Sequence, residues 1–97
     1  MATYILLGRY TAQGLKDIKK TTQRAQTVKQ MAAKAGLNMK ETYWTLGQYD
    51  VVAVFEAPDD EAMTAFALSV ARSGNVTTQT MRAFASTEMD TMLSKVS

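Results

Sequence analysis

The chain has 97 residues, of which 46% are apolar and 21% charged, with a net charge of +2 at pH 7. With no cysteine and no histidine, the sequence excludes disulfides, thiol nucleophiles, thiolate or imidazole metal ligands and the commonest general base. A chain of this size supports one hydrophobic core, so we expect residues 1–97 to form a single domain. Because the usual metal ligands are missing, we expect neither a metal nor a cofactor.

Residues 3–10, TYILLGRY, are predicted to form a strand that is apolar on both faces at its start. The alternating positions are Tyr4, Leu6, Gly8 and Tyr10 on one face and Ile5, Leu7 and Arg9 on the other. Residues 11–36 predict one long amphipathic helix, because apolar positions recur at steps of three and four and Gly36 suits a left-handed stop. These positions are Leu15, Ile18, Thr22, Ala25, Val28, Ala32 and Ala35.

Residues 37–46 and 49–57 predict two strands of a hairpin, joined by the two residues Gly47 and Gln48. After Pro58, Asp59 is a predicted N-cap of a helix that ends at Gly74 and buries Met63, Phe66, Ala67 and Val70. Residues 75–85 predict a final, threonine-rich strand. A short C-terminal helix follows, with Met89, Met92, Leu93 and Val96 on one side.

This β-α-β-β-α-β order predicts an α+β, ferredoxin-like fold: a four-stranded antiparallel sheet of order 4-1-3-2 with two helices on one face. The two strands predicted to be central, YILL and VVAVF, are the two that are apolar on both faces. Because two helices cover only one face, something else must cover the other. A second copy, packed sheet against sheet, is the simplest cover, and a bound apolar ligand is the alternative.

The segment ETYWTLGQYDVVAVFEAPDDEA, with the long basic helix before it and GNVTTQTMRAF after it, resembles the GYD domain family. The Gly-x-Tyr-Asp pattern of the family stands here as Gly47, Gln48, Tyr49 and Asp50, and the resemblance extends from about Tyr4 to Phe84. The resemblance implies a ferredoxin-like domain of the dimeric α/β-barrel kind. It does not supply a function.

Five residues are candidate ligand-binding groups: Arg9, Tyr10, Trp44, Tyr49 and Asp50. Asp50 either accepts backbone N–H groups beside a turn or acts as a base or ligand anchor next to Tyr49. Arg9, near the end of a central strand, is the best candidate for an anionic site. Trp44 and Tyr43 are predicted on opposite faces, and the aromatic residues suit core or interface packing as well as a ligand pocket.

No nucleic-acid or membrane partner is expected. Lys16, Lys19, Lys20, Arg24 and Lys34 form a basic helix side, but a solvated amphipathic helix predicts the same spacing and the net charge is mild. There is no run of eighteen apolar residues and no signal-peptide pattern, so we expect a cytoplasmic protein.

Three functions remain open from the sequence. The first is a non-enzymatic domain that forms homodimers or larger homo-oligomers through its sheet faces and holds a small apolar or anionic ligand. The second is a cofactor-independent enzyme of the oxygenase or isomerase type that uses Asp50, Tyr49 and Arg9 on a small organic substrate, an idea supported by fold analogy alone. The third is a regulatory ligand sensor. The lack of histidine disfavours haem chemistry that ligates iron through histidine.

Overall fold

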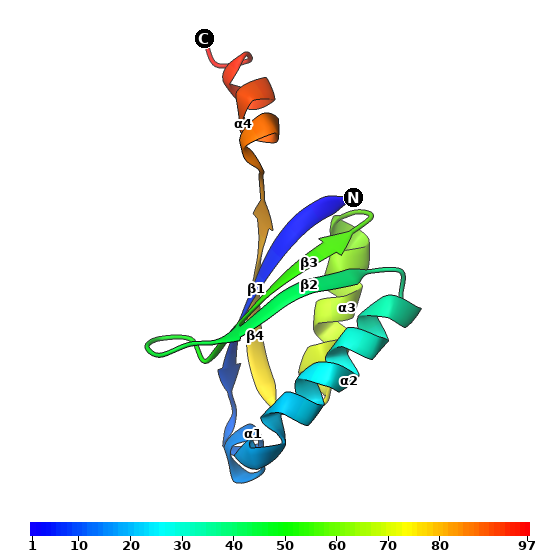
Figure 1. Cartoon of the computed structure of the whole chain (residues 1–97), viewed down its shortest axis with the longest axis vertical. Coiled ribbons are helices and arrows are strands. Elements are labelled where there is room, and N and C mark those ends of the chain that lie inside the picture. Colours follow the sequence, from blue (N-terminus) through cyan, green and yellow to red (C-terminus); the bar gives the residue numbers. More distant parts are fainter.

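The computed structural model describes residues 1–97 as β-α-β-β-α-β followed by a C-terminal helix (Figure 1). The strands are β1 (Ala2–Tyr10), β2 (Asn38–Trp44), β3 (Val51–Ala57) and β4 (Val76–Ala83). The helices are α1 (Ala12–Lys16), α2 (Thr21–Lys34), α3 (Asp60–Arg72) and α4 (Ser86–Leu93), with a 3₁₀ turn (Ile18–Lys20) between α1 and α2.

The four strands form one antiparallel sheet in the order β2-β3-β1-β4. This is the predicted order read from the opposite edge, so the predicted α+β topology is confirmed. The two strands that are apolar on both faces, β1 and β3, are neighbours in the middle of the sheet, where Ile5 pairs with Val54 and Leu7 with Val52.

Helices α2 and α3 cover one face of the sheet (Figure 1). The helix-facing residues of the two central strands are buried against them, and the Phe55 and Phe66 rings lie 5.4 Å apart between centroids. Ring pairs at this separation contribute beyond the area they bury. The buried core consists of Tyr4, Leu6, Ala32, Leu37, Ala53, Phe55, Ala57, Met63, Phe66 and Val70.

The prediction of one long helix over residues 11–36 is wrong. This segment forms α1, the 3₁₀ turn and α2 as separate elements. Thr11 caps α1 through Gly14 N–H, and the backbone N–H of Thr11 donates to Asn75 O at 3.1 Å. Gly14 lies so close to this carbonyl that a Cβ there would stand 2.1 Å from Asn75 O. Because α1 is fixed against the loop before β4, the chain turns at Asp17 and leaves Leu15 55% exposed.

The β2–β3 hairpin is confirmed, but its connection is six residues, 45–50, and not the predicted two. The backbone N–H of Thr45 donates to Asp50 O at 2.8 Å, and Gly47 has a φ of +120°. The predicted stops at Gly36 and Gly74 are confirmed by φ values of +82° and +83°. Asp59 is the N-cap of α3, as predicted, and accepts from Ala62 N–H. No helix combines the length and the apolar character needed to cross a membrane.

Candidate functional site

The sheet face opposite α2 and α3, called the open face below, carries an apolar centre. Strand pairing places Val52 between Leu7 and Tyr43, and Val54 between Ile5 and Glu41, all on this face. A bulge at Lys40 shifts the register of β2, which keeps Tyr43 on the open face and turns Trp44 to the helix side. The open face is thus a row of aliphatic side chains with polar residues around it.

The four central side chains, Ile5, Leu7, Val52 and Val54, are each partly exposed. Larger apolar residues on the outer strands extend the centre: Met81 is 41% and Tyr43 56% exposed. Tyr43 O–H donates to Glu41, and this bond raises the pKa of the Tyr43 phenol. The open face therefore presents a contiguous apolar patch.

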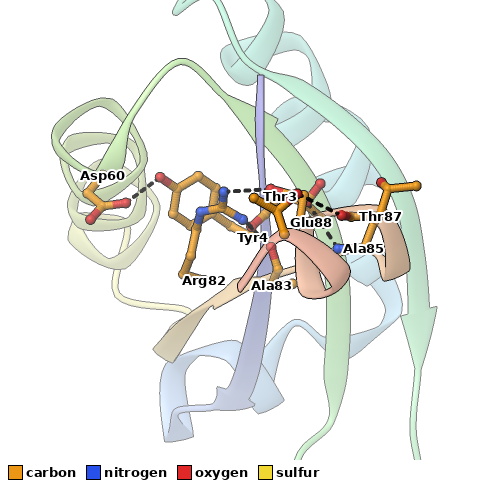
Figure 2. Close-up of polar contacts among 9 residues, drawn as sticks. Thr3, Tyr4, Asp60, Arg82, Ala83, Ala85, Thr87 and Glu88 are labelled. Atoms are coloured by element: carbon orange, nitrogen blue, oxygen red, sulfur yellow. Dashed lines mark hydrogen bonds and ion pairs between the residues drawn. The ribbon is translucent and has the colours of Figure 1, made fainter. Parts of the chain in front are cut away.

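A chain of polar contacts fixes where α4 leaves the sheet (Figure 2). Tyr4 O–H donates to Asp60 at the start of α3, which raises the pKa of the phenol. The Arg82 guanidinium lies 5.6 Å from the Tyr4 ring centroid and donates to Glu88 in α4 at 3.1 Å. Glu88 also accepts the backbone N–H of Ala85, and these two bonds, the Ala85 bond first, lower its pKa.

Helix α4 projects away from the sheet as an arm, and the molecule extends 51 Å along its longest axis (Figure 1). None of its residues is buried. Its predicted apolar side is in solvent, with Leu93 54% exposed, and Phe84 just before it is also exposed. The Arg82–Glu88 contact thus orients a helix that buries none of its residues against its own chain.

Asp50 makes backbone hydrogen bonds of the kind considered from the sequence. Its Oδ2 accepts the backbone N–H of Tyr10 at 2.9 Å, and its own N–H donates to Gly8 O at 2.8 Å. These bonds continue the β1–β3 pairing past Val51. Tyr49 O–H donates to Gln79 Oε1 at 2.7 Å, which ties the hairpin loop to the open face. Asp50 Oδ2 and the Tyr49 hydroxyl therefore each make a hydrogen bond within the chain.

Tyr10 and Trp44 meet at the N-terminus of α2, on the helix side of the sheet. The Tyr10 hydroxyl lies 2.7 Å from Thr21 Oγ1, and Trp44 Nε1–H donates to the same oxygen at 3.0 Å. Behind them lies a pocket of about 210 Å³ between the sheet and the two helices, the sheet–α2 pocket. Its lining includes Leu6, Gly8, Tyr10, Thr21, Arg24, Ala25, Val28, Met31, Met39, Trp44, Ala53 and Phe55.

Of the five predicted site residues, two line the sheet–α2 pocket. Tyr10 and Trp44 line the sheet–α2 pocket, and Asp50 touches it only through the Tyr10 backbone. Arg9 is exposed on the open face, where it pairs with Thr77 of β4. Arg9, Tyr49 and Asp50 are not among the residues that line the sheet–α2 pocket, and no group of three acidic residues could hold a metal ion.

Sequence reasoning missed Thr21 and Arg24 as pocket residues. The spacing assigns Arg24 to a solvated basic side of one long helix, but the break at Asp17 rotates α2 independently of α1. Its guanidinium reaches Gly14 O at 3.1 Å and lies 5.9 Å from the Tyr10 ring centroid. Its spacing from Thr21, three residues along a helix, was the available signal.

Comparison with solved structures supports the fold. The crystal structure of FFRP-DM1 superimposes with a TM-score of 0.60 at 20% identity, covering 87% of this chain and all of that one. The crystal structure of TTHA0845 from Thermus thermophilus superimposes with a TM-score of 0.57 at 25% identity, covering 89% of this chain and 96% of that one.

Sequence comparison identifies the family. A curated relative, the glutamine synthetase and cystathionine beta-lyase binding protein of Thermus thermophilus, is 33% identical over 84 residues, which is 86% of this chain and 88% of that protein. The sequence model of the GYD domain matches residues 4–93, which confirms the resemblance carried by Gly47, Tyr49 and Asp50. The chain belongs to the GYD domain family.

Proposed function

We propose that this chain is a non-catalytic protein-binding domain that works as a homodimer joined through its open face. The observation that carries the proposal is the apolar centre of that face, formed by Ile5, Leu7, Val52 and Val54 with no helix of the same chain over it. Completing the burial of one such side chain contributes up to about 1.5–3 kcal/mol. The free energy of unfolding of a small domain is only about 5–15 kcal/mol, so burying four such side chains is a large contribution.

A second copy suits this face because a two-fold axis makes the same patch meet itself. The charges are arranged for such a contact. Glu56 lies toward the end of β3 that pairs with the start of β1, and Arg9 lies at the far end of β1. A two-fold axis lying across the strands reverses one copy end to end and brings Glu56 of each chain toward Arg9 of the other. Unlike charges at the rim favour this register.

The arm adds area that the sheet alone lacks. Four strands about 4.8 Å apart and seven residues long span roughly 450 Å² in projection. A standard interface buries about 800 Å² of accessible surface on each partner, and a sheet face of this size, even allowing for the relief of its side chains, is small for that. We propose that the exposed apolar side of α4, held outward by the Arg82–Glu88 contact, packs against the second copy and supplies part of the difference.

The name of the Thermus relative supports a role in binding proteins, because that protein is described by two enzymes that it binds. A binding role requires shape and exposed surface and no catalytic centre. It agrees with the engagement of Asp50 and Tyr49 in bonds within the chain. We therefore propose enzymes of amino-acid metabolism, with glutamine synthetase as the first to test, as the partners of this dimer.

Light scattering tests the first step. Multi-angle scattering across protein concentrations should give twice the chain mass of 10.7 kDa. A constant mass of one chain up to tens of micromolar would refute the homodimer. Calorimetric titration with glutamine synthetase and cystathionine beta-lyase from the protein's own host tests the second step. Saturable binding of either enzyme is expected, and no heat with both enzymes would refute the assignment of partners.

A further inference from the structure

The sheet–α2 pocket lies on the opposite side of the sheet from the open face. Its floor is formed by helix-facing residues of β1 and β3, and its walls by α2, the end of β2, the last turn of α3 and the start of β4. Its volume of about 210 Å³ is below the usual range for drug-sized ligands. An apolar cavity of about 150 Å³ already accepts benzene, so this pocket has room for one ring or a short branched chain with a substituent.

Three small residues on facing elements leave the space open. Gly8 of β1 and Ala53 of β3 form the floor, and Ala25 of α2 faces them. Around them lie larger apolar side chains, among them Val28, Met31, Met39 and Phe55. An apolar molecule in this space would contact aliphatic and aromatic carbon on several sides.

The backbone does not require a glycine at position 8. Gly8 is not among the glycines with positive φ, and a Cβ there would meet its nearest atoms, in Val51, at 3.8 Å, an ordinary contact. A glycine inside a strand costs stability, and it often marks the close approach of a ligand. Gly8 lies inside a central strand, at the last pair of the β1–β3 register, and is best explained by the room it leaves in the pocket.

The rim of the pocket is polar. Thr21 Oγ1 holds the Tyr10 hydroxyl and the Trp44 indole N–H in place. Arg24 extends from the next turn of α2, and one of its nitrogens donates to Gly14 O at 3.1 Å. Apolar walls with a few fixed polar groups at the mouth are typical of small-molecule sites.

Arg24 is a partly buried cation without an acid partner. The two ion pairs of the chain are Lys40–Glu56 and Arg82–Glu88, and neither involves Arg24. A guanidinium has five N–H donors, and only one contact of Arg24 within the chain is a hydrogen bond. A carboxylate pairs with such a group through two parallel bonds, which a neutral polar group cannot do equally well.

From these observations we propose that the sheet–α2 pocket binds a small apolar molecule with one carboxylate, a single-ring or branched-chain acid. Its carboxylate pairs with Arg24 at the rim, beside Trp44 and Tyr10, and its apolar part occupies the space above Gly8. This site does not depend on self-association, because the open face lies on the other side of the sheet. A monomeric chain would leave the proposal intact.

The Trp44 indole N–H provides a direct probe, because the chain has one tryptophan. Phenylacetate, benzoate and isovalerate are titrated into ¹⁵N-labelled protein while this resonance is followed. At least one acid is expected to shift it saturably at millimolar concentration or below. Phenylacetamide, which has the same ring without the charge, is expected to bind at least tenfold more weakly than phenylacetate.

Two variants separate the contributions of charge and space. Arg24→Gln is expected to weaken binding of the best acid at least tenfold, whereas Arg72→Gln, which removes an exposed arginine at the end of α3 that does not line the pocket, leaves it unchanged. Gly8→Val fills the pocket and should abolish binding in a protein whose circular dichroism is native. If Gly8→Val does not fold, Ala25→Leu fills the same space from α2.

Three results would overturn the proposal. The first is the absence of a saturable shift with all three acids. The second is equal binding of phenylacetate and phenylacetamide, which would remove the carboxylate from the ligand class. The third is full binding in a folded Gly8→Val or Ala25→Leu protein, which would place the ligand outside the sheet–α2 pocket.

Discussion

Replacement of Ile5 by lysine places a charge in the centre of the open face. Ile5 lies on β1 between Val54 and Met81, and none of these neighbours is charged, so the lysine meets no like charge within its own chain. A lysine in a single chain can extend its ammonium group into water. The isolated fold should therefore tolerate Ile5→Lys, whereas a sheet-to-sheet contact should not.

The magnitude follows from the partial burial of Ile5. Full burial of such a side chain is worth about 1.5–3 kcal/mol, and the single chain already covers part of it, which leaves about 1–2 kcal/mol for the dimer contact. In a two-fold interface each chain contributes one Ile5, so the substitution weakens the dimer by about 2–4 kcal/mol in total. At about 1.4 kcal/mol for each factor of ten, the dissociation constant should rise roughly 30- to 700-fold. Removing the two ammonium groups from water adds to this cost.

Sedimentation equilibrium of the wild type and Ile5→Lys measures this difference, and circular dichroism verifies that the variant is folded. Leu68→Lys is the matched control, because Leu68 is 64% exposed on α3 and lies away from the open face. It should leave the dissociation constant within about threefold of the wild type. An Ile5→Lys protein that dimerises as tightly as the wild type would refute the placement of the interface on the open face.

Two further predictions concern stability and the arm. Asp50→Ala leaves the Tyr10 N–H without its acceptor and should lower the free energy of unfolding, measured by urea titration, by about 1–3 kcal/mol. The control Asp90→Ala should change it by less than about 0.5 kcal/mol. Equal effects of the two variants would contradict a structural role for Asp50. The pKa of Glu88 is lowered in the folded chain, so its contribution is present above the ordinary glutamate pKa of 4.5 and is lost as the pH falls through the lower, folded value. Carbon-detected NMR titration should show Glu88 titrating below 4.5 and returning toward it in Arg82→Ala, and an unshifted Glu88 in the wild type would contradict the orientation of α4 by this contact.

The sequence was sufficient for the sheet because its signals are local. The central strands are apolar at consecutive positions, and this distinguishes them from β2 and β4 before any contact is known. The stops at Gly36 and Gly74 and the cap at Asp59 depend on single residues with strong conformational preferences. The apolar strands, the helix stops and the helix cap all indicate the same element order, and the strand order was predicted from that element order.

The break between α1 and α2 was not predictable in the same way. The apolar spacing of three and four continues through Asp17, so the pattern favours one helix. The break depends on the fit of Gly14 against Asn75, far along the chain, which is a tertiary contact. The hairpin loop is a similar case, because Asp50 bonds to Tyr10 and Gly8 of another strand and so lengthens the connection.

The candidate site was only partly predictable for the same reason. Tyr10 and Trp44 were identified by residue type, and the structure places both at one pocket. Arg9 was favoured over Arg24 because it lies on a central strand. The rotation of α2 after the break is what brings Arg24 to the pocket rim. The three-residue spacing puts Arg24 on the same side of the helix as Thr21, but it does not show that this side faces the pocket.

Isotope-filtered NMR on a sample that mixes ¹³C-labelled and unlabelled chains tests the central claim most directly, since it detects only contacts between copies. The account predicts intermolecular nuclear Overhauser effects from the methyl groups of Ile5, Leu7, Val52 and Val54, and none from Leu68 on the outer side of α3. A sample in which those four side chains show no contact with a second chain would contradict it.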